Sequence, residues 1–126
     1  DILASYACKT LKTDAFATTR WGRAFKGGMR YMVGSHDLLW DSITTNEVGE
    51  DFADNLQGGQ VIKNAWKDGV SDWNTDQDAA AMVSGNSLAD CVSRRDGMKW
   101  RNFASGFPVR RDANASWLCW TTWDNL

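Results

Sequence analysis

Two short apolar segments, separated by a stretch with helical spacing, most constrain the fold of this chain. Residues 2–8 and 29–33 have the apolar content of buried strands. Between them, the apolar residues of 19–26 recur at the spacing of one helix face, and a glycine pair then ends that helix. A strand, a helix and a strand with short connections predict a βαβ unit, whose two strands pair in parallel. Because the first segment is mostly apolar, we expect it to lie at the centre of the sheet.

The rest of the chain predicts further helices and strands around this unit. Apolar residues in 48–56 and 61–66 recur at helical spacing on either side of a second glycine pair. The apolar run 79–83 fits a strand or a helix, and the β-forming residues of 117–123 predict a last strand. We therefore expect an α/β fold with a mostly parallel sheet and flanking helices. Residues 1–70 would form the βαβα segment, and residues 71–126 a Trp-rich C-terminal extension packed on the same domain.

Composition narrows the classes of function. A net charge of −2 argues against a nucleic-acid-binding protein, and no apolar run is long enough to cross a bilayer, so we expect neither partner. The chain has eight tryptophans in 126 residues. They either fill the core or form an exposed aromatic platform for a ligand such as a carbohydrate. We expect no cofactor and no metal, because the acids of 72–78 lack the glycine and terminal glutamate of a Ca²⁺ loop.

Three cysteines leave two interpretations of the redox environment. In a secreted protein an odd number leaves one thiol unpaired, and a Cys91–Cys119 disulfide would make Cys8 the free one. The alternative is three reduced thiols in a cytoplasmic protein. The chain begins at Asp1 without a methionine, which fits a processed chain, a fragment or a mature protein. We expect a secreted or extracellular location in the first case and a cytoplasmic one in the second.

Cys8 is the candidate for chemistry, because it closes the first apolar segment at the start of a polar connection. Reacting groups gather at the carboxyl ends of parallel strands, where a thiol is partly exposed and can be activated by a neighbouring base. The alternative is that Cys8 is a small buried hydrophobe. His36 follows the second predicted strand and would lie at the same edge. It would form either a dyad with Cys8, which needs a separation of about 4 Å, or part of the wall of a substrate groove.

The same residues resemble a known family. Residues 2–10, Ile-Leu-Ala-Ser-Tyr-Ala-Cys-Lys-Thr, resemble the strand and Ser-Ala-Cys-Glu-Thr-Gly segment of CHAT-type peptidases, which belong to the caspase-like cysteine peptidases with gingipains. Residues 23–35 are similar to the family's next helix and strand, and 52–66 to the helices after that. This resemblance covers residues 2–69. A second one, to uncharacterised caspase-like microbial proteins, includes 48–53 and 65–69. Together they imply a partial caspase-like fold in which Cys8 is the nucleophile.

The resemblance also implies a base and a substrate pocket. The family's catalytic histidine lies in a His-Gly motif upstream of the cysteine, so an upstream segment or a second chain would supply it. The loop after the second strand lines the pocket for the residue preceding the scissile bond, called P1. Here Asp37 or Asp41 would favour arginine or lysine at P1. Ser35 and Trp40 fall in the same loop. Thr10 stands where the family has the glycine of the oxyanion hole.

Two functions follow from the sequence. The first is a caspase-like cysteine peptidase, or its C-terminal chain, whose Cys8 thiolate attacks the carbonyl of a peptide or protein substrate. The alternative is a non-catalytic secreted binding protein or pseudo-peptidase whose tryptophans contact a ligand such as a carbohydrate. An accompanying His-Gly segment would favour the peptidase.

Overall fold

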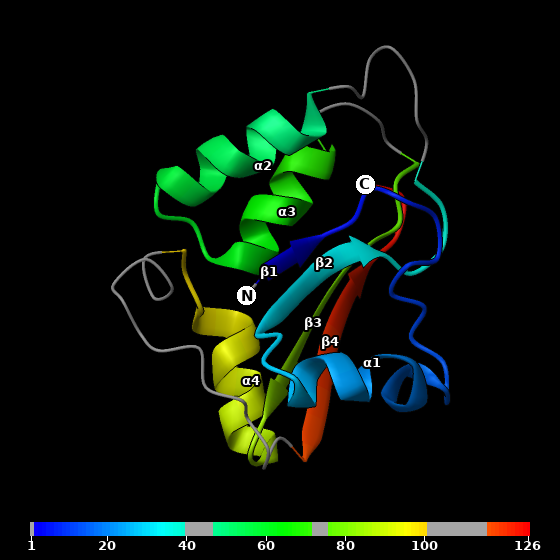
Figure 1. The fold of residues 1–126 in the computed structure, drawn as a ribbon. Coiled ribbons are helices and arrows are strands. Elements are labelled where there is room, and N and C mark those ends of the chain that lie inside the picture. The colour runs from blue at the N-terminus through cyan, green and yellow to red at the C-terminus, as the bar shows by residue number, and fades with distance from the viewer. Residues whose placement is uncertain (1, 40–46, 72–75, 101–115) are drawn as a thin grey trace.

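The computed structural model describes residues 2–39, 47–71, 76–100 and 116–126, and these form one open sheet with helices on both faces (Figure 1). The sheet order is β1-β2-β3-β4, so strands that follow one another in the chain are neighbours in the sheet. The strands are β1 (Ile2–Ala4), β2 (Tyr31–Ser35), β3 (Ala79–Gly85) and β4 (Trp117–Trp123).

The predicted βαβ unit is confirmed. β1 and β2 pair in parallel, with Ile2 opposite Tyr31, and α1 (Ala17–Lys26) connects them. The expectation that β1 is central is wrong for the part of the chain that the structure describes, because β1 has only three residues and pairs there with β2 alone. Its Leu3 side chain is 37% exposed, whereas every residue of β2 and β3 is buried.

The expectation of a mostly parallel sheet is also wrong. β3 runs antiparallel to β2, and β4 runs antiparallel to β3, so the sheet is mixed. Two helices, α2 (Val48–Gln57) and α3 (Ile62–Ser71), lie between β2 and β3. The chain enters β3 at the edge where it left β2, as the hydrogen bond from the Asp78 N–H to the Leu38 carbonyl shows. A single helix would have carried the chain to the opposite edge and made β3 parallel.

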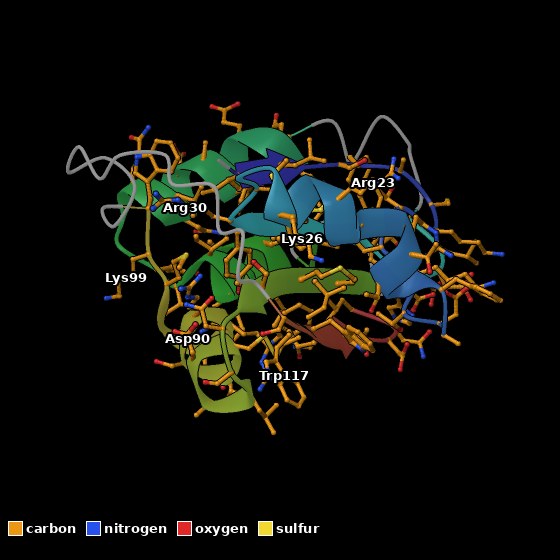
Figure 2. All side chains as sticks on the ribbon, turned by 60° about the horizontal axis from the view of Figure 1, so that its bottom comes forward. Arg23, Lys26, Arg30, Asp90, Lys99 and Trp117 are labelled. Atoms are coloured by element: carbon orange, nitrogen blue, oxygen red, sulfur yellow. A yellow bond between two sulfur atoms is a disulfide. The ribbon has the colours of Figure 1, made fainter. Side chains whose placement is uncertain are left out.

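Two apolar clusters cover the two faces of the sheet. One contains Phe25 of α1 and Met82 of β3. The other contains Phe52 of α2, Trp66 of α3 and Cys91 of α4 (Leu88–Gly97), packed against the opposite face. Figure 2 shows α1 and α4 on opposite sides of the sheet. None of the helices in the described residues is long and apolar enough to span a bilayer.

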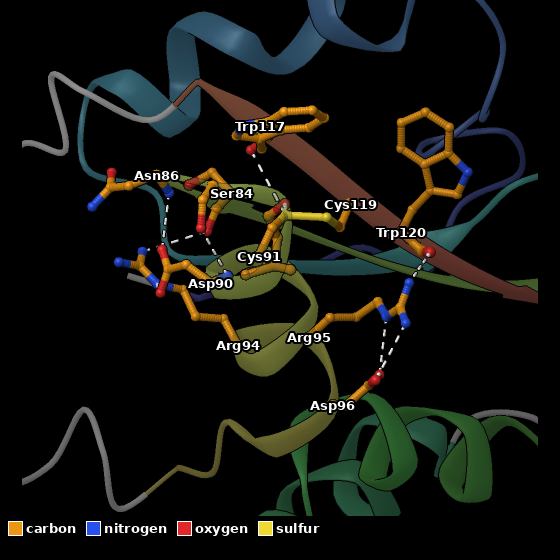
Figure 3. Close-up of a disulfide and its surroundings, with 12 residues drawn as sticks. Ser84, Asn86, Asp90, Cys91, Arg94, Arg95, Asp96, Trp117, Cys119 and Trp120 are labelled. Atoms are coloured by element: carbon orange, nitrogen blue, oxygen red, sulfur yellow. Dashed lines mark hydrogen bonds and ion pairs between the residues drawn. A yellow bond between two sulfur atoms is a disulfide. The ribbon is translucent and has the colours of Figure 1, made fainter.

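The helix α4 does not follow from the apolar pattern of the sequence, and a disulfide holds it to the sheet. Ser87 caps it, because its hydroxyl accepts a hydrogen bond from the Asp90 N–H at 3.1 Å. Cys91, fully buried on this helix, is bonded to Cys119 of β4 (Figure 3). This is the pairing considered in the sequence analysis, and it leaves Cys8 as the free thiol.

Candidate functional site

The candidate site lies at one edge of the sheet, where β1, β2 and β4 end and β3 begins; we call it the carboxyl edge. Beyond Ala4, backbone hydrogen bonds join the segment that follows β1 to the end of β2 and to the loop after it. The N–H of Lys9 donates to the Asp37 carbonyl at 2.8 Å, and that of Leu11 to the Ser35 carbonyl at 2.8 Å. Lys9 has the left-handed φ of 58° that such a sharp turn requires. The turn is therefore fixed to the end of β2.

Cys8 lies in this turn with an exposed side chain. The Leu39 N–H donates a hydrogen bond to the Cys8 sulfur at 3.4 Å, and the Cys8 thiol donates to the Leu39 carbonyl at 3.3 Å. Leu39 is itself buried in the core. The alternative that Cys8 is a small buried hydrophobe is wrong, because the residue is exposed and its sulfur is held by backbone groups.

His36 lies at the same edge, and its imidazole contacts the end of β4. Its Nε2 lies 2.9 Å from Oδ1 of Asp124 and 3.3 Å from the Trp123 carbonyl oxygen. Trp123 is the last residue of β4, and Asp124 follows it. The side chain is 19% exposed. Among the described residues, the hydrogen bonds of His36 and of Cys8 go to different partners, so the predicted Cys8–His36 dyad is not formed in this structure.

A surface hollow of about 330 Å³ lies beside the turn and has a mixed charge; it is lined by Lys9, Lys12, Thr13, Asp14, His36 and Asp37. Asp37, predicted to recognise a basic P1 residue, is about half exposed there and forms an ion pair with Lys9 at 3.5 Å. Burial would raise the pKa of Asp14, but hydrogen bonds from the Phe16 N–H and from Arg20 hold it below its ordinary value. Asp14 therefore presents an ionised carboxylate to the hollow at neutral pH.

Two of the other predicted pocket residues lie outside the described residues, namely Trp40 and Asp41. The third, Ser35, is fully buried. Its hydroxyl donates to the Asp78 carbonyl at 2.6 Å and accepts from the Asp37 N–H at 3.2 Å. The hydroxyl therefore joins the end of β2 to the start of β3, and contact of Ser35 with substrate stays a prediction.

The tryptophans in the described residues have different roles. Trp66 is buried, stacks edge-on against Phe52 at 5.3 Å between ring centroids, and donates its indole N–H to the Gly34 carbonyl at 2.9 Å. Trp117 and Trp120 are 48% and 36% exposed. They stand three positions apart on β4, and so on opposite faces of the sheet. These two side chains therefore form no shared aromatic platform.

Two acids that were not predicted as site residues complete the carboxyl edge. Asp78 directly precedes β3, and Asp124 directly follows β4. Because β3 and β4 are antiparallel, with Ala79 opposite Trp123, the two acids lie side by side next to His36. The sequence did contain a signal for this pair, because one acid directly precedes a strand and the other directly follows the next strand.

Residues 1–124 match a family model described as a domain of unknown function, DUF6345. The match spans all four strands and all four helices of the described residues. No curated protein and no solved structure matches the chain. The family match gives no link to caspase-like peptidases, so that resemblance stays a prediction.

Proposed function

The chain belongs to the DUF6345 family, and we propose that it carries the nucleophile of a caspase-like cysteine peptidase, either as the enzyme or as its C-terminal chain. One observation supports this proposal above the others. The free thiol of Cys8 is exposed at the carboxyl end of a parallel strand pair, in a turn whose backbone is hydrogen-bonded to the next strand. Open α/β sheets present ligands and reacting groups at such edges.

The proposed reaction is attack of the Cys8 thiolate on a peptide carbonyl, which gives an acyl-enzyme and releases an amine after protonation of the leaving nitrogen. Water then attacks the thioester and regenerates the thiol. The tetrahedral oxyanion needs backbone N–H donors. The Lys9 N–H already donates to Asp37. The Cys8 N–H has no hydrogen-bond partner among the described residues, so the turn can offer it as a donor.

The base that accepts the thiol proton has two candidate sources. His36 lies at the same edge, but its Nε2 contacts Asp124 and the Trp123 carbonyl, so the ring would have to turn to reach Cys8. The resemblance to caspase-like peptidases instead implies a histidine from an upstream His-Gly segment or a second chain. The observed partners of His36 favour the second source.

Basic residues at P1 are the proposed substrate preference. Asp37 lies beside the Cys8 turn, and its present partner Lys9 is exposed and displaceable. An arginine guanidinium binds a carboxylate through two parallel hydrogen bonds, which a lysine ammonium cannot make, so a P1 arginine would compete for Asp37.

The direct test measures thiol reactivity and turnover on native material, with any co-purifying chain retained. Intact mass after iodoacetamide should show one alkylated site, at Cys8, because the other two cysteines are bonded to each other. A fluorogenic panel with Arg, Lys, Asp or Asn at P1 should show the fastest turnover for arginine. Cys8→Ser should lower kcat/KM by at least about 10³-fold.

His36→Ala and Asp37→Asn separate the roles of the neighbouring residues. With an external base, His36→Ala retains turnover, whereas Asp37→Asn loses the preference for arginine over asparagine. An unreactive Cys8 in the native protein, or turnover that survives Cys8→Ser, would overturn the peptidase. Faster turnover with Asp or Asn at P1 would overturn only the substrate preference.

The alternative, a binding protein with a tryptophan platform, has less support. The exposed Trp117 and Trp120 lie on opposite faces of the sheet, so the two cannot stack on one sugar surface.

A further inference from the structure

Three side chains that can each bind a metal ion converge at the carboxyl edge. His36 follows β2, Asp78 precedes β3 and Asp124 follows β4, so adjacent ends of three strands supply them. One nitrogen or oxygen atom from each lies within 4.8 Å of the others. The closest pair is His36 Nε2 and Asp124 Oδ1, at 2.9 Å. The catalytic proposal above uses neither acid.

The charge of this cluster is not balanced by the protein. Among the described residues, neither Asp78 nor Asp124 forms an ion pair with a lysine or arginine. The two lysines that line the surface hollow together with His36 pair with other acids, Lys9 with Asp37 and Lys12 with Asp14. Two neighbouring carboxylates repel each other, and the imidazole of His36 can offset at most one negative charge. A divalent cation at the centre of the three groups would remove the repulsion.

The carboxylate of Asp78 is held in place by backbone groups. Its Oδ2 accepts from the Leu38 N–H at 3.3 Å and its Oδ1 from the Asn125 N–H at 3.1 Å. Each carboxylate oxygen has a second lone pair that remains for a metal. Reciprocal backbone bonds between Gln77 and Leu126, at 3.3 and 2.9 Å, extend the pairing of β3 and β4 past this point. Hydrogen bonds that fix a ligating group in this way are a common feature of metal sites.

From this arrangement we infer that His36, Asp78 and Asp124 bind a divalent first-row transition-metal ion, with Zn²⁺ as the probe. Imidazole nitrogen and carboxylate oxygen are ligands that Zn²⁺ accepts at about 2.0–2.2 Å. Two such ligands in a tetrahedral site stand about 3.4 Å apart, so His36 Nε2 and Asp124 Oδ1, now 2.9 Å apart, would need to separate by only about 0.5 Å. The Trp123 carbonyl oxygen, 3.3 Å from Nε2, is a fourth donor. Ca²⁺ and Mg²⁺ prefer ligand sets made only of oxygen, so the imidazole selects against them.

Metal binding has a chemical requirement and a structural consequence. His36 Nε2 must give up its proton, either to Nδ1 of the same ring or to solvent, before it can ligate. A bound ion would then fix the ends of β2 and β4 to the start of β3. The inference does not rest on the proposed peptidase, because it uses no property of Cys8.

The test is titration of chelator-treated protein with Zn²⁺ by calorimetry, in a Cys8→Ser background that removes the free thiol as a competing ligand. We expect one Zn²⁺ per chain and a rise in Tm with added Zn²⁺, whereas Ca²⁺ and Mg²⁺ leave Tm unchanged. Co²⁺ in the same site should give visible d–d absorption. Asp124→Asn changes a side chain that is 69% exposed, so the fold should tolerate it, and affinity should fall by at least about ten-fold.

Asp37→Asn is the matched control, since it removes an exposed acid next to His36 that is outside the cluster. It should bind Zn²⁺ as tightly as the parent, and His36→Gln should bind as weakly as Asp124→Asn. Circular dichroism establishes that each variant is folded. Absence of saturable Zn²⁺ binding, or equal affinity in Asp124→Asn and Asp37→Asn, would mean that His36 and Asp124 form an ion pair only. A Tm response to Ca²⁺ that Asp124→Asn abolishes would overturn the choice of metal.

Discussion

At the residue scale, a close approach of α4 to the sheet depends on one glycine. Gly85 ends β3, and a Cβ atom there would lie 2.5 Å from the backbone nitrogen of Cys91 and 2.6 Å from its Cα. Both atoms belong to the backbone of α4, which Cys119 holds in place through the disulfide. Gly85→Ala must therefore push the helix away from the sheet. We expect the free energy of unfolding to fall by about 3 kcal/mol, the upper range for overpacking, as measured by urea denaturation.

Gly49→Ala is the matched control for this substitution. Gly49 lies in α2, and an added Cβ would meet no atom within 4 Å. Alanine favours the helical conformation over glycine, so we expect unchanged stability or a gain of up to about 1 kcal/mol. Similar losses for both variants would show that the approach of Cys91 to Gly85 is not the cause.

At the element scale, one acid joins α3, α4 and β4. Asp96 accepts from Arg95 at 2.9 Å and from Lys63 of α3 at 3.1 Å, and Arg95 also donates to the Trp120 carbonyl of β4 at 3.2 Å (Figure 3). The hydrogen bond from Arg95 lowers the pKa of Asp96 to about 2, with Lys63 adding to the effect against the opposing effect of burial. The folded state therefore holds this carboxylate ionised to lower pH than the unfolded chain does.

This pKa predicts part of the acid sensitivity. A carboxyl group whose pKa is lower in the folded state stabilises the fold above its unfolded value of 3.8, and this contribution is lost as the pH falls from there to about 2. Because Asp96 is 43% exposed, the contribution should stay below about 1 kcal/mol. Asp96→Asn should lose less stability than the wild type between pH 5 and pH 2.5 in urea denaturation. Asp54→Asn, an exposed acid of α2 with no ion pair among the described residues, should follow the wild type.

The helices that the sequence predicted are those with a strong apolar period. The helices at residues 17–26, 48–57 and 62–71 each have a buried face whose apolar spacing can be recognised in the sequence. In α4 only Cys91 is buried, so the helix depends on the Ser87 cap and on a disulfide rather than on a stripe of apolar residues. Residues 5–8 were predicted as strand, but β1 ends at Ala4 and the chain then turns, with Lys9 in a left-handed conformation.

Only part of the candidate site could be predicted from the sequence, because the rest depends on tertiary contacts and strand register. Strand order along the chain placed Cys8 and His36 at one edge, and both lie there. Which way the imidazole points is a property of the tertiary contacts, and periodicity carries no such information. Asp78 and Asp124 stand far apart in the sequence, and only the antiparallel register of β3 and β4 brings them together. In the mostly parallel sheet expected from the sequence, those two positions would lie at opposite edges.

At the scale of the whole molecule, the disulfide joins α4 to β4 in the second half of the chain. Cys91 and Cys119 are 28 positions apart, and the segment between them includes residues 101–115, of which the structure describes nothing. β4 is the strand at the end of the sheet, and it supplies Asp124 and the Trp123 carbonyl to the carboxyl edge. The covalent bond therefore acts on the same strand that completes the proposed metal site.

Removing this bond should lower stability without disturbing the first half of the sheet. Closing a loop of this length removes chain entropy from the unfolded state that corresponds to about 3–4 kcal/mol. In a Cys8→Ser background, which leaves the disulfide as the only redox-active group, Cys91→Ala with Cys119→Ala should lower the free energy of unfolding by that amount.

Added reductant should change the unfolding midpoint of the background protein but not that of the double variant. The native double variant should also bind Zn²⁺ more weakly, because β4 is then held by its hydrogen bonds and apolar packing without a covalent bond to α4. Equal stability with and without the bond would mean that pairing of β3 with β4 already fixes α4 and β4 in place.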